Sequence, residues 1–320
     1  MFDSFQIVFL TYVNRSGSTY LCHLLDNSEE VISCPEAEIL VSLFLCNPEN
    51  KLTDKTLYKL KKAIYTDIKL KHWGFHEEDL GSLNGTITNV ECFKYLLDLF
   101  RKKNKPEAKT VLFKAEYLVF LYPILMSYNF LWLSIIRDIR AVWYSQSRTI
   151  NPYTNKAFSK SLFRTANYWN NHVKKAMSNS ENKNYKLIIF ENLVTNFQKT
   201  ILEISSFLGI SDLNMIGANH VSPYLILPEQ KDIHKNIKRT PQKDFINKWA
   251  LHLDEEEQYI LCLVSSKLIK KFTILTCDFS KFNFSGMKKM IIRIKIFFNI
   301  LMTNIGTLYR NGVKLRFKKI

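Results

Sequence analysis

The chain lacks the cysteine patterns that tie small folds together or bind structural zinc. It has six cysteines, and none of them stands in a CxxC pair or beside a cluster of histidines. They are Cys22, Cys34, Cys46, Cys92, Cys262 and Cys277. Because disulfide frameworks and zinc sites both need ligands at short fixed spacings, this scatter argues against either. We expect free thiols in a reducing cytoplasm and no bound metal.

The chain also lacks internal repeats, low-complexity segments and a leader-like stretch at its start. An apolar, strand-like stretch already begins at Gln6, which leaves no room for a signal peptide or an N-terminal membrane anchor. The 320 residues, 47% of them hydrophobic, are enough to bury a full core. We therefore expect a cytoplasmic globular protein.

Acidic residues are missing from the C-terminal end, where no Asp or Glu follows Asp278. This end carries ten of the sixteen net positive charges of the chain. Its basic residues are Lys281, Lys288, Lys289, Arg293, Lys295, Arg310, Lys314, Arg316, Lys318 and Lys319. They alternate with Ile, Phe, Leu and Met and interrupt the apolar run too soon for a bilayer span. The pattern predicts a basic amphipathic tail over 281–320, which either lies on an anionic membrane surface or packs on its own domain.

Between these ends, apolar β-branched stretches alternate with helical patterns. Strands are predicted over residues 6–12, 31–33, 110–114, 130–136 and 186–190. Helices are predicted over residues 19–25, 54–65, 90–102, 139–148, 160–177, 194–208 and 254–270. This alternation indicates an α/β fold with a parallel sheet. Residues 40–109 show helical patterns without a convincing strand, so we expect an insertion over the carboxyl edge of the sheet, where substrates are usually selected.

The most informative motif lies where the first predicted strand gives way to a helix, in the run Arg15-Ser16-Gly17-Ser18-Thr19. Such a junction points unpaired backbone N–H groups and the positive end of the helix at one spot. Gly17 permits a positive φ or a close backbone approach, Ser18 and Thr19 can cap the helix and bond an anion, and Arg15 adds a fork of donors. The motif predicts a phosphate or sulfate site, although a similar turn also occurs in α/β proteins without one. It is not a Walker A loop, because Gly-Lys-Ser/Thr is missing.

A second strand-to-helix junction follows the predicted strand 130–136. It reads Arg137-Asp138-Ile139-Arg140, and the following helix carries Ser145. Arg137 at the strand tip and Ser145 two turns later can converge on one anion, because arginine offers a bidentate fork and serine a further donor. Taken alone, the string fits a surface cluster of salt bridges equally well.

Together the two junctions resemble the sulfotransferase superfamily. The loop 15–19 looks like that family's 5′-phosphosulfate loop, and residues 136–148 look like its 3′-phosphate motif. A third segment, Lys186-Leu-Ile-Ile-Phe-Glu-Asn-Leu-Val194 with the Phe-Leu-Gly-Ile run that ends at Ile210, is similar to the family's YEDLV…FLGI strand and helix. The resemblance covers roughly residues 5–260.

The resemblance implies a P-loop-kinase-like three-layer α/β fold over 1–280, with 3′-phosphoadenosine-5′-phosphosulfate (PAPS) as the sulfuryl donor. It implies that Arg15 and the loop Ser16 to Thr19 hold the 5′-phosphosulfate end. Arg137 and Ser145 match the ligands of the 3′-phosphate. Arg239, in Lys-Arg-Thr-Pro, matches more loosely the basic loop that closes over the nucleotide.

Details of the motifs are nearest to the carbohydrate and bacterial trehalose-type, or glycolipid, sulfotransferases. These more often have Arg in the loop, as at Arg15, followed by a short strand and a Pro-Glu element, here Pro35-Glu36. The strand that ends at Lys114 also looks like one of that branch. The resemblance implies a carbohydrate or glycolipid hydroxyl as acceptor. One departure is that the catalytic His of the small-molecule sulfotransferases has no clear counterpart here.

Sulfuryl transfer should resemble phosphoryl transfer, in which positioning and charge stabilisation contribute most of the rate. We expect Arg15 and the loop N–H groups to offset negative charge on the leaving phosphate. Glu36 is the candidate base, because Pro35 fixes the chain so that Glu36 lies over the loop, and Glu38 is the second choice. Both acids are also compatible with an ordinary helix N-terminus.

Two other functions share part of this pattern. A P-loop kinase for a small molecule or sugar would have the same fold, but its Gly-Lys-Ser/Thr and a clear Mg²⁺-binding Asp are missing. A nucleic-acid or membrane adaptor would explain the charge but neither strand-end motif. We expect a cytoplasmic sulfotransferase that binds no nucleic acid and whose tail either contacts the inner face of a membrane or packs on its own domain.

Overall fold

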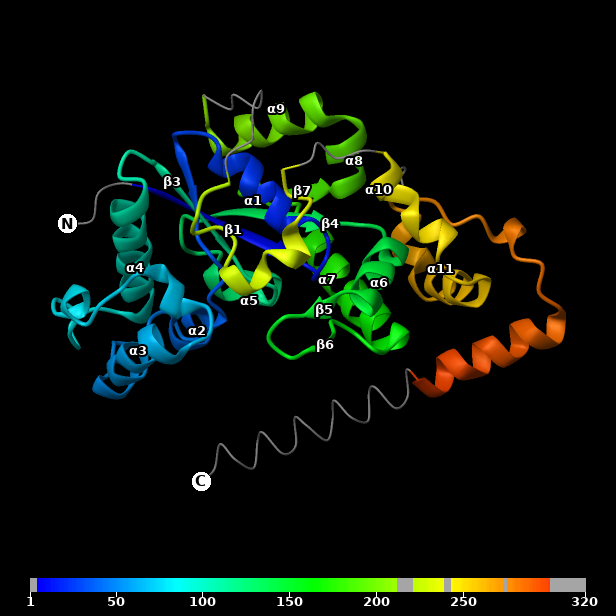
Figure 1. Cartoon of the computed structure of the whole chain (residues 1–320), viewed down its shortest axis with the longest axis horizontal. Coiled ribbons are helices and arrows are strands. Elements are labelled where there is room, and N and C mark those ends of the chain that lie inside the picture. Colours follow the sequence, from blue (N-terminus) through cyan, green and yellow to red (C-terminus); the bar gives the residue numbers. More distant parts are fainter. Residues whose placement is uncertain (1–4, 212–220, 239–242, 273–274, 300–320) are drawn as a thin grey trace.

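A five-stranded sheet forms the centre of the computed structural model, which describes residues 5–211, 221–238, 243–272 and 275–299 (Figure 1). All neighbouring strands of this sheet pair in parallel. In spatial order they are β2 (Val31–Ser33), β3 (Thr110–Lys114), β1 (Gln6–Tyr12), β4 (Leu131–Ile136) and β7 (Tyr185–Ile189). A short antiparallel pair lies outside the sheet and consists of β5 (Ile150–Asn151) and β6 (Lys156–Ala157).

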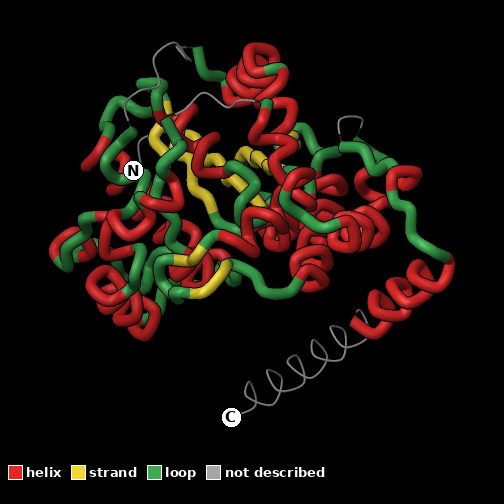
Figure 2. The backbone as a smooth tube through the Cα atoms, turned by 45° about the vertical axis from the view of Figure 1, so that its right-hand side comes forward, coloured by secondary structure: helices red, strands yellow, loops and turns green. Residues whose placement is uncertain are grey.

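Helices cover both faces of this sheet (Figure 2). They are α1 (Ser18–Asp26), α2 (Glu38–Leu40), α3 (Asp54–Thr66), α4 (Asn89–Asn104), α5 (Leu118–Leu125), α6 (Ile139–Arg148), α7 (Leu162–Asn179), α8 (Phe190–Thr195), α9 (Phe197–Leu208), α10 (Asp244–Asn247) and α11 (Glu255–Ile269). Val8 and Leu10 of β1 belong to a core with α1 and α9, whereas Ile7 and Phe9 belong to a core with α4 and α7. The side chains of alternate residues in one strand thus pack on opposite faces of the sheet. The prediction of a three-layer α/β fold with a central parallel sheet is confirmed.

The carboxyl ends of three central strands finish side by side. Leu10 of β1 pairs with Lys114 of β3 on one side and with Leu133 of β4 on the other. The loop into α1, the turn into α5 and the turn into α6 therefore emerge at the same edge of the sheet. In open parallel sheets this edge is where ligands bind.

The helix predicted over 194–208 is in fact two helices, α8 and α9. The chain leaves the helical conformation at Asn196, where φ is −125° and ψ is 46°. In addition, α8 begins at Phe190 directly after β7, so this residue is helical and is not the last strand residue. This early turn places the Phe190 ring against the loop at Gly17.

Residues 40–109, which we expected to form one insertion, contain two different parts. Helix α4 packs on the sheet, because the Phe93 ring lies 5.9 Å from the Phe9 ring and 5.1 Å from the Phe113 ring. A capping box of Thr88 and Glu91 starts this helix. Helix α3 and the short turns after it precede α4 and contribute Lys69 to the site described below. Only this earlier part, with α3 and the turns after it, is therefore an insertion added to the layered core.

The described part of the C-terminal tail is a helix over residues 286–299. Ile292 and Ile296 are buried in a small core with Tyr259 and Phe282. The rest of the predicted tail lies outside the described residues. In the part of the chain that the structure describes, no helix combines the length and apolarity needed to cross a membrane.

Candidate active site

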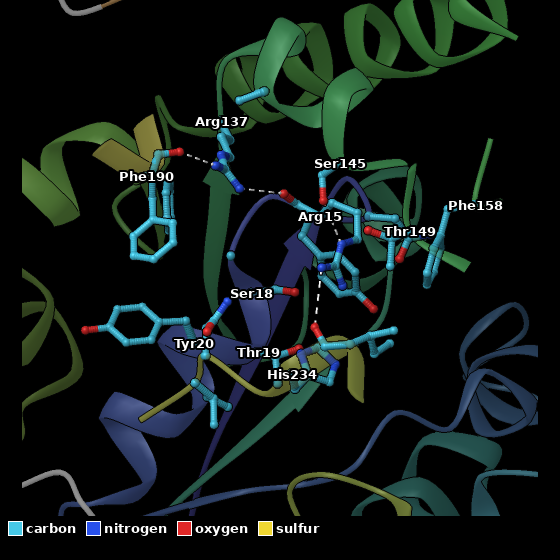
Figure 3. Close-up of a pocket in the computed structure, with 18 of the residues that line it drawn as sticks. Arg15, Ser18, Thr19, Tyr20, Arg137, Ser145, Thr149, Phe158, Phe190 and His234 are labelled. Atoms are coloured by element: carbon cyan, nitrogen blue, oxygen red, sulfur yellow. Dashed lines mark hydrogen bonds between the residues drawn. The ribbon is translucent and has the colours of Figure 1, made fainter. Parts of the chain in front are cut away.

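Both predicted anion motifs line one cavity of about 410 Å³ at the carboxyl edge of the sheet (Figure 3). The first motif contributes Arg15, Gly17, Ser18 and Thr19. The second contributes Arg137 and Ser145. The two strand-to-helix junctions therefore face the same cavity, as binding of one ligand by both motifs requires.

Gly17 gives the first loop its shape. Its φ of 90° lies in the left-handed region that favours glycine, and a Cβ at this position would lie 2.4 Å from Cδ2 of Phe190. Gly17 is also the N-cap of α1, which corrects our expectation that Ser18 or Thr19 caps the helix. Because Gly17 has no side chain and the first helical bond runs from Leu21 N–H to the Gly17 carbonyl, at 3.0 Å, the preceding N–H groups face beyond the helix end. An anion can accept hydrogen bonds there.

Two of the predicted loop hydroxyls differ in their placement. Thr19 lies on the cavity wall, where its Oγ1 accepts a hydrogen bond of 2.9 Å from Lys114 Nζ. Ser16, in contrast, is fully buried, and its hydroxyl has no hydrogen-bond partner among the described residues. Its side chain does not line the cavity, so its contribution is to the fold of the loop.

Direct contacts join the two motifs to each other. Arg15 Nε donates to Ser145 Oγ at 3.0 Å, and Arg137 Nη1 donates to the Arg15 carbonyl at 3.2 Å. Arg137 also donates from Nη2 to the Phe245 carbonyl at 2.9 Å, and its guanidinium lies 4.5 Å from the centre of the Phe190 ring. Figure 3 shows these side chains converging from three segments of the chain.

The two arginines bring positive charge to the site, and the nearby carboxylates of Glu191 and Asp138 act on that of Arg137. Within the described residues neither Arg15 nor Arg137 forms an ion pair, and Arg137 Nε has no acceptor. Burial and the charge of Arg137 lower the pKa of Arg15 to about 10, so it still carries its charge at neutral pH. Burial likewise lowers the pKa of Arg137. A bound anion would relieve both the repulsion and the missing hydrogen bond.

The predicted salt bridge forms with a different arginine of the second motif, and it is buried and does not lie on the surface. Asp138 caps α6 and binds Arg140, with Oδ2 2.5 Å from Nη2. The Arg140 guanidinium lies 3.9 Å from the centre of the Trp249 ring. Arg140 is therefore the structural partner of Asp138, and Arg137 remains available to a ligand.

A later segment covers the cavity and contributes residues that sequence analysis missed. The Ile233 carbonyl accepts a hydrogen bond of 3.4 Å from Arg15 Nη2, and His234, Phe245 and Trp249 line the wall. Burial, with the charges of Lys114 and Arg15 adding to it, lowers the pKa of His234 to about 3, so its ring is neutral. No periodicity marks these residues, because they lie in helices of about one turn. The predicted Arg239 lies outside the described residues.

Glu36 lies on the cavity wall, as its predicted role requires, but its carboxylate is fully engaged. It accepts hydrogen bonds from the Tyr12 hydroxyl at 2.5 Å and from Lys69 Nζ at 2.6 Å, and Lys114 Nζ is 3.3 Å away. Burial alone would raise the pKa of Glu36, but the charges of Lys114 and Lys69 outweigh it and hold the pKa well below its usual value. Glu38, the second choice, binds Lys69 at 2.8 Å and is more exposed.

Glu116 is a second carboxylate at this edge, and sequence analysis passed over it. It lies two residues after the end of β3, where Asn14 Nδ2 donates a hydrogen bond of 2.7 Å to its Oε2. No lysine or arginine forms an ion pair with it in the described ranges. Burial, and then the charge of Glu36, raise the pKa of Glu116 to about 7. Its position just beyond Lys114 at a predicted strand end was the available signal.

The chain belongs to the sulfotransferase family: residues 8–214 match the model described as "Sulfotransferase family". It is therefore a sulfotransferase, an enzyme that uses PAPS as sulfuryl donor. This family membership also decides against the P-loop kinase. No curated protein matches the chain by sequence.

The solved structures similar to this one include two sulfotransferase domains of biosynthetic proteins. The sulfotransferase domain from the Synechococcus PCC 7002 olefin synthase shares 17% identity, over 84% of this chain and 96% of that domain, with a TM-score of 0.55. The sulfotransferase domain from the curacin biosynthetic pathway shares 14% identity, over 82% of this chain and 97% of that domain, with a TM-score of 0.56. At these identities the likeness establishes the fold.

The charges of the cavity fit PAPS, which carries anionic groups at two ends. The N–H groups at the start of α1 and the Arg15 side chain could hold the 5′-phosphosulfate, and Arg137 and Ser145 could hold the 3′-phosphate. Among the described residues, no group of three or more His, Cys, Asp or Glu could hold a metal ion. Arg15, Arg137 and Lys114 bring positive charge to this edge of the sheet.

Proposed function

We propose that the enzyme transfers the sulfuryl group of PAPS to a hydroxyl of a carbohydrate or glycolipid. The observation that carries the donor half is the 3.0 Å hydrogen bond from Arg15 Nε to Ser145 Oγ, which places the two anion motifs in direct contact. A single adenosine 3′,5′-bisphosphate (PAP) moiety can then span both. ATP, which has no 3′-phosphate, would leave the Arg137 end unfilled.

Sulfuryl transfer requires the protein to stabilise charge on the leaving group and to accept a proton from the acceptor. Arg15 and the N–H groups of the loop offset negative charge as the bond from sulfur to the bridging oxygen breaks. A carboxylate on the acceptor side receives the proton of the hydroxyl. Glu36, which the sequence predicted for this role, lies on the cavity wall, where its carboxylate binds Lys69 and Lys114.

Exposed aromatic rings beside the carboxylates support a carbohydrate acceptor. Tyr117 and Phe120 are 57% and 37% exposed, and both rings pack near Tyr168, with centroids 6.1 and 6.3 Å away. Tyr117 follows directly after Glu116 in the chain, and Phe120 lies one helical turn further on. Sugar rings present apolar C–H faces that pack on aromatic rings, while their hydroxyls bond carboxylates. An apolar patch bordered by polar groups is typical of such a binding site.

The C-terminal helix supports a location at the inner face of a membrane. Its exposed apolar residues are Met287, Met290, Ile291, Ile294, Phe297 and Phe298. Four basic residues interrupt them, each contributing roughly 1 kcal/mol near anionic lipid, and no acid follows Asp278. A glycolipid acceptor would be presented at that surface. If truncation after Lys281 left sedimentation with anionic liposomes unchanged, this location would be wrong.

Transfer of radiolabelled sulfate from PAPS tests the acceptor class. The panel would contain α,α-trehalose, a neutral oligosaccharide, a glucosyl glycolipid and 2-naphthol as the non-carbohydrate comparison. We expect label on a sugar, and inhibition by PAP but not by ATP. Mass spectrometry of surface glycans with and without the protein then identifies the lost sulfate ester. Label on 2-naphthol alone would overturn the carbohydrate assignment and leave the donor assignment standing.

A further inference from the structure

Two carboxylates meet the same edge of the sheet in opposite surroundings. Glu36 is held by Lys69, Lys114 and the Tyr12 hydroxyl. Glu116 has only neutral hydrogen-bond partners, Asn14 and Tyr168, and forms no ion pair within the described residues. The two carboxylates are close enough for the charge of Glu36 to act on Glu116. When neighbouring acids differ in this way, one keeps its charge and the other can take up a proton.

The position of Glu116 links it to the donor loop. Asn14, which binds its carboxylate, directly precedes Arg15 and lines the donor cavity. The Asn14 carbonyl in turn accepts a hydrogen bond of 2.8 Å from Gln146 Nε2 of α6. Glu116 is partly buried and precedes the exposed ring of Tyr117. It therefore lies between the donor loop and the aromatic patch assigned above to the acceptor.

We infer that Glu116 is the catalytic base that accepts the proton of the acceptor hydroxyl, and that Glu36 remains ionised as the partner of the two lysines. This inference rests on the proposed function. In the reaction the O–H bond of the acceptor breaks and its proton moves to a carboxylate oxygen of Glu116. The acceptor oxygen forms a bond to sulfur, and the bond from sulfur to the 5′-phosphate oxygen breaks, releasing PAP. The proton then leaves to solvent.

The surroundings of each carboxylate support this division. A base works best when its pKa lies near the working pH, and the pKa of Glu116 is raised to about 7. The ionisable and polar groups that act on it are Glu36 and Glu38, which raise its pKa, and Asn14 and Tyr168, which lower it. Glu36 has a pKa held well below its usual value by two lysines and binds a proton weakly.

The test compares three variants with the wild type: Glu116→Gln, Glu116→Asp and Glu36→Gln. Glu107→Gln is the matched control, because this exposed acid precedes the start of β3 whereas Glu116 follows its end. Turnover is measured against pH with the best acceptor of the panel above, and PAP affinity is measured by calorimetry. Glutamine at 116 keeps an acceptor for Asn14, so unchanged PAP affinity reports an intact loop.

We expect wild-type kcat to rise with pH through about 7. Glu116→Gln should lower kcat by about 10² to 10⁴-fold and abolish this rise, which is the acidic limb of the pH profile. Glu116→Asp should restore part of the lost kcat and part of the acidic limb. Glu36→Gln should move the limb to lower pH, because the charge that raises the pKa of Glu116 is gone. Glu116→Gln activity within about threefold of wild type, or a limb that persists in it, would overturn the inference.

A second measurement is independent of the acceptor. In protein carrying ¹³C-labelled glutamate carboxyls, the signal missing from Glu116→Gln identifies residue 116. We expect it to titrate near pH 7 and at lower pH in Glu36→Gln. A midpoint at the usual glutamate value would refute the division between the two acids. If no compound of the panel receives labelled sulfate, the carbohydrate or glycolipid acceptor proposal fails. The titration still decides whether the Glu116 carboxyl group is protonated at neutral pH.

Discussion

Replacement of Gly17 by alanine should cripple donor binding without unfolding the protein. The φ of 90° alone costs a side chain about 1–2 kcal/mol. The added Cβ would also lie 2.4 Å from the Phe190 ring, so either the loop or the ring must move. That ring packs against the Arg137 guanidinium at 4.5 Å, a contact worth about 0.5–2 kcal/mol. The free loop can relax, whereas anion binding requires the original geometry, so the cost of about 2–4 kcal/mol should appear as lost affinity.

This cost corresponds to a roughly 30- to 1000-fold rise in the Kd for PAP, at about 1.4 kcal/mol per tenfold. Calorimetric titration with PAP measures it. Gly209→Ala is the matched control, because its φ of 68° imposes similar strain but nothing lies within 4 Å of a Cβ there. We expect this control to lose some thermal stability and no PAP affinity. Adding Phe190→Leu to Gly17→Ala should restore part of the affinity by removing the clash. An unchanged Kd in Gly17→Ala would refute the assignment of this loop to the donor.

Three further predictions follow from the same contacts. Arg137→Lys should weaken PAP binding at least about tenfold, because lysine cannot form the bidentate contact. The variant should barely change the affinity for adenosine 5′-phosphosulfate, which has no 3′-phosphate. Equal losses of affinity for both ligands would contradict the 3′-phosphate role. Asp138→Ala should lower the free energy of unfolding in urea by about 3–5 kcal/mol, because it removes the cap of α6 and leaves buried Arg140 without its ion-pair partner. A decrease in this free energy below about 1 kcal/mol would show that the fold does not need the pair. Burial, and then the charge of Asp138, raise the pKa of Glu191 to about 7. The stability from its bound proton is therefore complete below about pH 4.5 and lost as the pH rises through about 7, and Glu191→Gln should flatten unfolding free energy over that window.

Local sequence patterns predicted the layered core well, because period and composition report directly on burial. All five strands of the sheet were expected within one residue of their observed bounds, since each is an apolar run that has to be covered on both faces. The division of residues 190–208 into α8 and α9 was missed. A helical pattern runs through Asn196, and only packing shows that the chain bends there.

The donor half of the site was readable for the same reason. Gly17 and Arg137 stand at strand ends, and parallel strands place their carboxyl ends at one edge. Which arginine of the second motif stays free for a ligand was not readable. Arg137 and Arg140 are equivalent in the string, and only the cap of α6 shows that Asp138 takes Arg140.

By itself, the sequence determined the parallel sheet, the two anion motifs and the family to which they belong, because these depend on short segments and their order. The tertiary structure decided what distant segments do to one another. Lys69 comes from outside the layered core to hold Glu36, and His234 comes from an irregular covering segment. Glu116 owes its raised pKa to burial and to a charge eighty residues away in the chain. Electrostatic fields act through space, so the division of labour between the two acids could be assigned only once the chain was folded.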